Sequence, residues 1–292
     1  IRTHLPTKPR LCHLGFYGAM LGSPLLQHDP LEIFLMRIAT WNINGLRARL
    51  DFIKLWLEAR QPNVVGLQEL KTPTEDFPHD FFADLGYRAL VHGQKSWNGV
   101  AILTNVDAEH RQSGLPGEEA WGARLITAEI EGGLEFTTVY CPNGKSVEHD
   151  DYPNKLRWYD SLCSHWLQND HPDRILCGDF NIVPEPRDSW RGEGGNGDIF
   201  HTVDERTRLQ ALMETGLTDL YRLRHPHEQA FSWWDYRGGA FHRKHGLRID
   251  FLLGTGKAVQ CTREVVIDRD FRKKQDGLTA SDHAPVYADL DW

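Results

Sequence analysis

The sequence lacks several features that would assign it to a specialised class of protein. Only five of its 292 residues are cysteine, and no two of them form a C-x-x-C pair. A disulfide framework and a cysteine-based zinc site are therefore not expected, and the thiols are predicted to be reduced, in a cytoplasmic protein. No apolar run approaches the roughly 18 residues that a helix needs to cross a bilayer, so we expect no membrane partner.

An excess of positive charge is missing as well. Lysine and arginine number 33 against 41 aspartates and glutamates, which gives a formal net charge of -8 at pH 7. This balance argues weakly against a nucleic-acid binder, because neutralising phosphates requires lysine and arginine. Metal-binding carboxylates would also make a sequence acidic, so the net charge leaves the partner open.

The first 35 residues differ in character from the rest of the chain. They contain four prolines and no sustained hydrophobic period, whereas a regular pattern starts at Met36. We expect residues 1–35 to be an extraneous or disordered N-terminal extension and Met36 to be the natural start. Residues 36–292 are long enough to bury a large core in one extended domain.

Short apolar runs alternate with helical patterns after Met36. The runs that predict strands cover 37–42, 63–67, 99–104, 124–130, 134–140, 174–177, 230–234, 249–253, 259–267 and 286–290. Helical patterns cover 51–60, 153–167 and 204–215. So many strands with so few helices favour an α/β domain of two stacked, mostly antiparallel sheets flanked by helices, rather than a doubly wound sheet.

Polar residues that can bind metal or transfer protons lie at the ends of several predicted strands. They are Asn42, Glu69, Asp179, Asn181, Asp250, Asp282 and His283. Each one alone could be a turn former, and the segment SDHAP by itself favours a surface turn. Together they favour metal-assisted phosphodiester hydrolysis, because Mg²⁺ takes one or two carboxylates plus phosphate oxygens. A further carboxylate would activate water, while amides and an imidazole would hold the phosphate.

Six sequence segments occur in a fixed order between Met36 and Trp292. They are WNINGLRARL, VVGLQELK, VYCPNGK, LCGDFNIVP, FSWWDYRGGAFHRKHGLRIDFLL and SDHAP. As an ordered set they resemble the exonuclease III family of apurinic/apyrimidinic endonucleases, within the endonuclease/exonuclease/phosphatase superfamily. The resemblance implies a four-layer α/β sandwich, with residues 36–292 forming a single catalytic domain.

The resemblance also implies roles for individual residues. Glu69 matches the principal ligand of a Mg²⁺ or Mn²⁺ ion, with the Asn42 amide beside it and Asp282 as a further acid near the metal. The residues that match the catalytic groups are Asp179 for water activation, Asn181 and His283 for phosphate binding, Asp250 as the partner of the imidazole, and Tyr140 as the phenol that approaches the scissile phosphate. For Tyr140, a buried tyrosine with a satisfied hydroxyl is the alternative interpretation.

Aromatic and basic residues near the C-terminus are candidates for contacts with DNA. Trp233 matches the family's substrate-pocket aromatic, and Arg237 follows it within the same segment. Arg272, Lys273 and Lys274 form the most basic run, just before SDHAP. Core tryptophans and a solvated charged face are the alternative interpretations.

The activity that the resemblance implies is a 3′–5′ exodeoxyribonuclease and abasic-site endonuclease of base excision repair. Its partner would be duplex DNA with abasic sites or 3′ ends, and the protein would act as a monomer. Two departures stand out: Leu70 in QELK, and GEGGNG, which is not a dinucleotide-binding motif because no strand precedes it. A non-catalytic nucleic-acid-binding regulator and a lipid or inositol phosphoesterase are the two alternatives.

Overall fold

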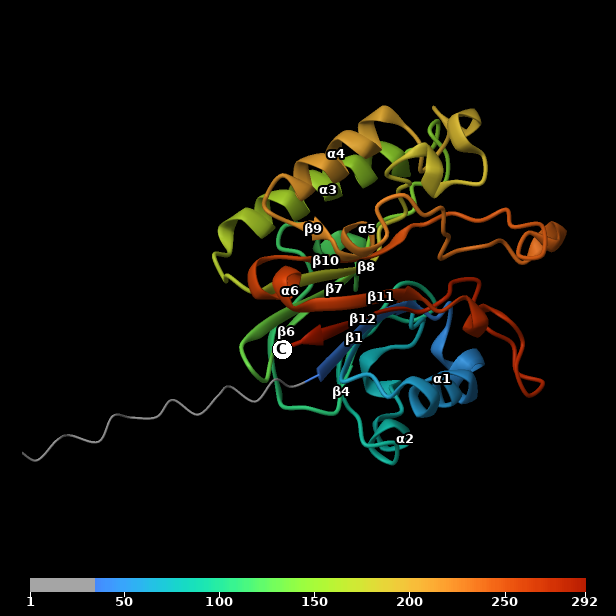
Figure 1. Cartoon of the computed structure of the whole chain (residues 1–292). Helices are drawn as coiled ribbons and strands as arrows, with labels where there is room; N and C mark the ends of the chain where they lie inside the picture. The colour runs from blue at the N-terminus through green and yellow to red at the C-terminus, as the bar shows by residue number, and fades with distance from the viewer. Residues whose placement is uncertain (1–34) are drawn as a thin grey trace, which may run out of the picture. The chain divides into compact units, whose positions relative to one another are not determined.

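Two six-stranded sheets stack face to face, and helices cover their outer sides (Figure 1). The structure is a computed structural model that describes residues 35–292. The extension expected at 1–35 therefore lies, apart from Leu35, outside the described residues. The layers follow in the order helices, sheet, sheet, helices, so the predicted four-layer α/β sandwich is confirmed.

The first sheet has the strand order β11-β12-β1-β2-β4-β3. Its strands are β1 (Leu35–Asn42), β2 (Val64–Gln68), β3 (Arg88–His92), β4 (Val100–Thr104), β11 (Thr262–Ile267) and β12 (Val286–Asp291). Only β1 and β2 run parallel among its neighbouring strands.

The second sheet repeats this arrangement with the strand order β5-β6-β7-β8-β10-β9. Its strands are β5 (Ala108–Ser113), β6 (Leu125–Ile130), β7 (Leu134–Tyr140), β8 (Arg174–Asp179), β9 (Thr218–Asp219) and β10 (Asp250–Gly254). Only β7 and β8 run parallel, so the prediction of mostly antiparallel sheets is confirmed.

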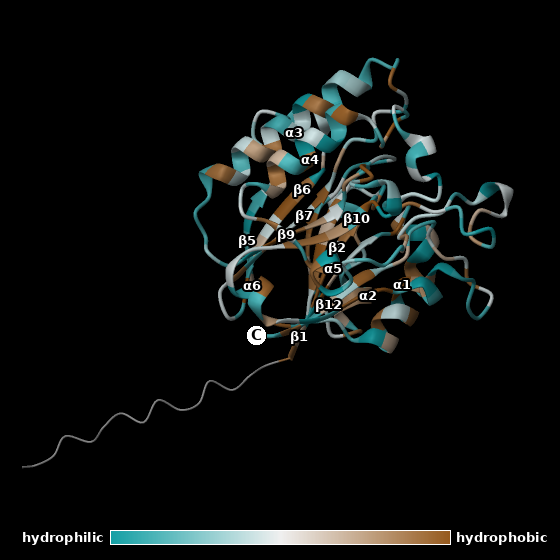
Figure 2. Cartoon of the chain, turned by 45° about the horizontal axis from the view of Figure 1, so that its top comes forward, coloured by the Kyte–Doolittle hydropathy of each residue, from teal (hydrophilic) through white to brown (hydrophobic). Residues whose placement is uncertain are grey.

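The helices of residues 35–292 are α1 (Leu46–Arg60), α2 (His79–Ala83), α3 (Asp151–Gln168), α4 (Val203–Met213), α5 (Leu220–Arg224) and α6 (Gly256–Cys261). The four helices α1 to α4 pack on the outer faces of the sheets, whereas α5 and α6 contact strands of both sheets. In Figures 1 and 2, α1 and α2 lie beside the first sheet, and α3 and α4 lie side by side over the second. The helices carry both hydrophilic and hydrophobic residues, whereas the central strands are mainly hydrophobic (Figure 2).

Three apolar clusters correspond to the three interfaces between the layers. One contains Ile38 and Phe136 and fills the space between the sheets. Another joins the first sheet to α1 through Trp41 and Trp56, and a third joins the second sheet to α3. Neighbouring residues of a strand point to opposite faces, which is why a strand buried on both sides is apolar throughout.

Two predicted strands differ from the structure. Residues 230–234 form no strand, because Trp233 makes only single bridges to Leu247 and His283 and no continuous ladder develops. In the run 259–267, α6 extends to Cys261 and the strand starts at Thr262. A short apolar run does not distinguish a buried strand from a short helix.

The sequence patterns also missed several elements. These are the edge strands β3, β5 and β9 and the short helices α2 and α5. An exposed edge strand carries polar and charged residues in place of strict alternation, as EHRQS in β5 does. Helix α1 begins at Leu46 rather than at residue 51, so the pattern underestimated its length.

The described cysteines agree with the expectation of reduced thiols. Cys141, Cys163, Cys177 and Cys261 are all free, and two of them are fully buried. Within residues 35–292, no helix is both long and apolar enough to cross a bilayer.

Candidate active site

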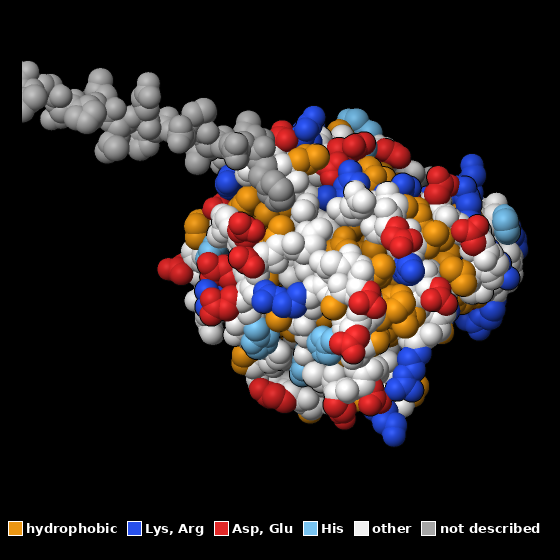
Figure 3. Space-filling model, turned by 90° about the horizontal axis from the view of Figure 1, so that it is seen from below, with side chains coloured by type: hydrophobic (Ala, Val, Ile, Leu, Met, Phe, Trp, Pro, Cys, Tyr) orange, Lys and Arg blue, Asp and Glu red, His pale blue; other side chains and the backbone are white. Residues whose placement is uncertain are grey.

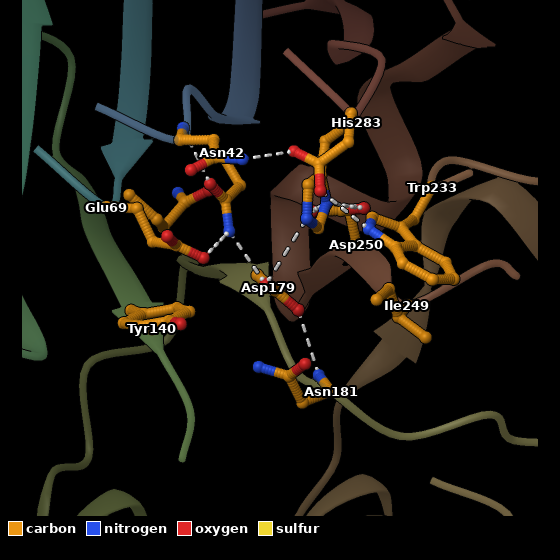
Figure 4. A network of polar contacts seen from close by, with 12 residues as sticks. Asn42, Glu69, Tyr140, Asp179, Asn181, Trp233, Ile249, Asp250 and His283 are labelled. Carbon is orange, nitrogen blue, oxygen red and sulfur yellow. Dashed lines mark hydrogen bonds and ion pairs between the residues drawn. The ribbon is translucent and has the colours of Figure 1, made fainter. Parts of the chain in front are cut away.

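The candidate site forms where central strands of both sheets end. Asn42 is the last residue of β1 and Glu69 directly follows the parallel strand β2, so both emerge at one edge. Tyr140 and Asp179 end the parallel strands β7 and β8 and pair in register, and Asp250 opens β10 opposite Asp179. Figure 4 shows these side chains converging, with His283 and Asn181 beside them. The structure thus brings the predicted catalytic residues together.

Asn42 links the two sheets through its side-chain amide. Its Nδ2 donates to Glu69 Oε1 at 2.9 Å and to Asp179 Oδ2 at 2.8 Å (Figure 4). The backbone N–H of Asn44 donates to Asn42 Oδ1 at 3.0 Å, which fixes the orientation of the amide. Asn42 therefore holds two carboxylates from different sheets at a set distance.

His283 carries a positive charge between two carboxylates. Its Nδ1 lies 3.0 and 2.9 Å from the two oxygens of Asp250, and its Nε2 lies 3.8 Å from Asp179 Oδ2. Burial alone would lower the pKa of His283, but Asp250 and Asp179 raise it well above its ordinary value. Ser232 Oγ donates to Asp250 Oδ2 at 2.5 Å and so holds the carboxylate in place. The imidazolium can therefore attract a phosphate at neutral pH.

Asp179 lies at the centre of the network and is buried. Burial raises the pKa of Asp179, and the nearby Asp250 and Glu69 carboxylates raise it further, against the opposing effect of His283. The backbone N–H of Asn181 donates to Asp179 Oδ1 at 2.9 Å, and Asn181 Nδ2 donates to the Cys141 carbonyl at 3.0 Å. Asp179 thus lies in a buried, charged environment that is unlike that of an ordinary surface acid.

A hard divalent cation fits the oxygen atoms gathered here. Ligand atoms of Glu69, Asp179 and His283 lie within 4.8 Å of one another. The imidazole is a poor ligand, however, because its charged form has no free lone pair and its Nδ1 is engaged by Asp250. Burial would raise the pKa of Glu69, but Lys71, whose Nζ lies 2.8 Å from Oε2, lowers it, so Glu69 stays ionised. Carboxylate oxygens are the ligands of Mg²⁺ and Mn²⁺.

Asp282, predicted near the metal, joins the network indirectly. Its Oδ1 accepts from Asn44 Nδ2 at 2.8 Å, and its Oδ2 accepts from Trp233 Nε1 at 3.0 Å. Burial would raise the pKa of Asp282, but the His283 charge and these two hydrogen bonds lower it. Asp282 is thus an ionised carboxylate that also orients Trp233.

Tyr140 stays protonated at neutral pH. Burial raises the pKa of its phenol well above the ordinary value, and the Glu69 and Asp179 carboxylates raise it further. The Arg124 guanidinium lies 4.8 Å from the ring centroid and donates to the Tyr140 carbonyl at 3.0 Å. The phenol can therefore donate a hydrogen bond to a phosphate oxygen. Arg124 was not predicted as a site residue, since its position at the start of a strand gives no signal.

An apolar cluster lies next to the charged groups. Its members are Val183, Leu247 and Ile249, with Phe200 and Trp233 packed against them. The Trp233 and His283 rings lie 6.5 Å apart at 60°, which places the predicted substrate-pocket aromatic beside the predicted phosphate-binding imidazole. Leu247, Ile249 and Phe200 were missed, because apolar residues in a loop look like ordinary core residues.

The predicted DNA-contacting basic residues divide into two groups. Arg272 is only 8% exposed, and its guanidinium donates to the carbonyls of Asp282 and Trp234 at 3.0 Å each. The predicted contact of Arg272 with DNA is therefore corrected: a buried guanidinium with these partners supports the loops instead of reaching a DNA backbone. Arg237, Lys273 and Lys274 are exposed, although Arg237 pairs with Asp235 and Lys273 with Asp270.

The surface carries both signs of charge. Figure 3 shows acidic and basic side chains interspersed over the face seen from below, with no uniform basic field. Attraction of a polyanion would therefore depend on local basic groups near the site.

The fold and the site together define a class of protein. The chain belongs to the Endonuclease/Exonuclease/phosphatase family, whose sequence profile matches residues 39–283. It is 35% identical over 270 residues to exodeoxyribonuclease III of Haemophilus influenzae, covering 87% of this chain and 100% of that protein. The resemblance to the exonuclease III family is thereby confirmed.

Solved structures show the same relationship. The 3′–5′ exonuclease NExo from Neisseria meningitidis matches with a TM-score of 0.84 and 35% identity over 88% of this chain and all of that one. An AP endonuclease from Archaeoglobus fulgidus matches with a TM-score of 0.83 and 31% identity, again over 88% of this chain and all of that one.

Proposed function

We propose that this chain is a divalent-metal-dependent DNA phosphodiesterase that cleaves 5′ to abasic sites and removes nucleotides from 3′ ends of duplex DNA, in base excision repair. The observation that carries the proposal is the Asn42 amide joining Glu69 to Asp179, with the His283 imidazolium beside them. The similarity to an exodeoxyribonuclease III and to an AP endonuclease supports this substrate class.

In this mechanism Asp179 accepts the proton of the attacking water. Its raised pKa makes it a better proton acceptor than an exposed aspartate, as long as it is ionised. Asn181, Tyr140 and His283 donate hydrogen bonds to the phosphate, and these groups are already in place before the substrate arrives. Asp250 fixes the imidazole ring and its charge.

Glu69 would hold the Mg²⁺ or Mn²⁺ ion, with Asn42 and Asp282 close to it. When bound, the ion would neutralise phosphate charge and stabilise the departing 3′ oxygen. Lys71 lies against Glu69 and lowers the cost of gathering carboxylates in this interior position.

The apolar cluster around Trp233 would contact a deoxyribose that has lost its base. Leu247 and Ile249 have no hydrogen-bonding groups in their side chains, so a base edge would lose its water there without compensation.

We propose further that the protein acts as a monomer in the cytoplasm, and that the exposed Arg237, Lys273 and Lys274 approach the DNA backbone.

The test is cleavage of a labelled duplex that carries one abasic-site analogue, beside an undamaged duplex. Each is incubated with Mg²⁺, with Mn²⁺ and with chelator, using the wild type and Asp179→Asn. Metal-dependent incision that the variant loses is the expected result, and the ladder on undamaged DNA measures the exonuclease activity. Tight DNA binding without cleavage under every metal would identify a regulator instead, and hydrolysis of inositol phosphates alone would identify the other alternative.

A further inference from the structure

A buried lysine lies behind the phosphate-binding loops. Lys155, on α3, has no exposed surface, and its Nζ donates to the Asn181 carbonyl at 2.7 Å and to the Asn143 carbonyl at 3.2 Å. Asn143 follows β7 and Asn181 follows β8, so one side chain bridges the loops after both parallel strands. The Asn143 side chain also donates to Asn181 Oδ1 at 3.3 Å, which links the loops on the side of the site.

The lysine is held in place by a buried carboxylate from the neighbouring helix. Lys155 Nζ lies 2.5 Å from Glu205 Oε1, and both side chains have no exposed surface. The Asn143 carbonyl, the Asn181 carbonyl and Glu205 together use the three hydrogens of an ammonium group. Glu205 is itself fixed, since it accepts hydrogen bonds from the backbone N–H groups of Phe200 and Thr202 at the start of α4.

The loop that carries Asn143 packs closely against the lysine. A Cβ at Gly144 would lie 2.9 Å from Lys155 Cδ, so the loop backbone packs directly against the lysine stem. Interiors packed this closely transmit small displacements. A change at Lys155 therefore shifts the loop that carries Asn143 and the loop that carries Asn181.

We infer that Lys155, held by Glu205, is a positioning residue for phosphodiester hydrolysis: it fixes Asn181 and, through the Asn181 backbone N–H, the Asp179 carboxylate. This inference rests on the proposed function. It assigns a catalytic consequence to an ion pair that has no exposed surface and therefore cannot contact the substrate directly. Buried ion pairs add little net stability compared with apolar packing, so a role in geometry is the better account of this one.

The variants separate geometry from stability. Lys155→Met removes the donor from both carbonyls and leaves Glu205 as an unpaired buried charge. The double variant Lys155→Met with Glu205→Gln removes that unpaired charge but still leaves the carbonyls without their donor. Arg37→Met is the matched control, because it breaks the partly buried Arg37–Asp289 ion pair at the other end of β1.

The readouts are the single-turnover incision rate on the abasic duplex, the DNA dissociation constant in chelator, and the melting temperature. We expect Lys155→Met to lower the rate by about 10- to 100-fold, since small misplacements of catalytic groups have effects of this order, with little change in DNA affinity. The double variant should regain melting temperature but not rate. Arg37→Met should lose melting temperature and keep the rate.

A double-mutant cycle tests the link to Asn181. In the Asn181→Ala background, Lys155→Met should slow incision by a smaller factor than it does in the wild type, because the Asn181 side-chain amide is already gone and only the effect through the Asn181 backbone N–H on Asp179 remains. Additive losses, a wild-type rate in Lys155→Met, or recovery of the rate in the double variant would each overturn the inference.

A readout without catalysis separates this inference from the proposed function. In metal-free protein, the side-chain amide resonances of Asn143 and Asn181 should shift in Lys155→Met and remain unchanged in Arg37→Met. If the wild type fails to incise DNA, the proposed function fails and the catalytic role of Lys155 fails with it, whatever the resonances show. If the wild type incises DNA and the resonances stay fixed, only the inference about Lys155 fails.

Discussion

Replacing Asp179 with asparagine should abolish incision and at the same time stabilise the metal-free protein. Asp179 is buried among Glu69 and Asp250, and burial is the largest cause that raises its pKa to about 7. A raised pKa of an acid means that the folded state disfavours the ionised carboxylate. The ionised Asp179 carboxylate, which the proposed chemistry requires, therefore destabilises the metal-free folded state.

The magnitude follows from the pKa. A value of about 7 in place of 3.8 disfavours the ionised form by about 4 kcal/mol, at about 1.4 kcal/mol per pKa unit. Asparagine supplies one acceptor oxygen instead of two, so a hydrogen bond from Asn42 or Asn181 is lost at a cost of about 1–2 kcal/mol. We expect a net gain of about 2 kcal/mol, or roughly 4–8 °C in melting temperature for a domain of this size.

The assay is thermal unfolding of both proteins in chelator between pH 4 and pH 8. Because the folded pKa is raised, the wild type loses stability as the pH rises through the folded pKa. The advantage of the variant should therefore be small near pH 4 and largest above pH 7. A variant that is less stable than the wild type at pH 8, or an advantage that shrinks with rising pH, would refute this account of the buried carboxylate.

Three further predictions concern neighbouring groups. Asp250→Asn should lower both the incision rate and the free energy of unfolding, the latter by about 3 kcal/mol by chemical denaturation, because it leaves the buried His283 without its main partner. Trp233→Ala should weaken binding of the abasic duplex about tenfold in a fluorescence titration, more than binding of undamaged duplex, since it removes the ring from the apolar cluster. Arg272→Ala should lower the melting temperature, because two loop carbonyls lose their donor. Lys274→Ala should leave the melting temperature unchanged, and the number of counterions released on DNA binding, measured from the salt dependence of the dissociation constant, should fall by about one.

The sequence predicted the strands that build the core because their apolar runs report burial directly. The elements that it missed, such as β5 and β9, lie at sheet edges, where burial no longer dictates residue type. The segment 230–234 was misassigned for a related reason: Ser232 and Trp234 are buried and the others are half-buried, but Trp233 makes only isolated bridges. Apolar composition reports burial and leaves hydrogen-bond pairing undetermined.

The catalytic candidates were predictable because they lie at the ends of strands in recognisable motifs. The residues that support them were not, since their role depends on contacts between distant segments. Lys155 meets Glu205 from a different helix, and Arg272 resembles the exposed lysines beside it although its side chain is buried. A basic residue in a linear sequence carries no information about which of these environments it occupies.

The two parallel strand pairs explain why the site lies where it does. In sheets that are otherwise antiparallel, the parallel pairs β1–β2 and β7–β8 each bring the carboxyl ends of two strands to one edge of the sheet. The sheets approach closely beneath this edge because position 66 is glycine, where a Cβ would lie 2.5 Å from Thr138 Oγ1 of the facing strand. This close approach lets the Asn42 amide of one sheet reach the Asp179 carboxylate of the other. The geometry of the site is thus set by how the sheets stack, which no single motif encodes.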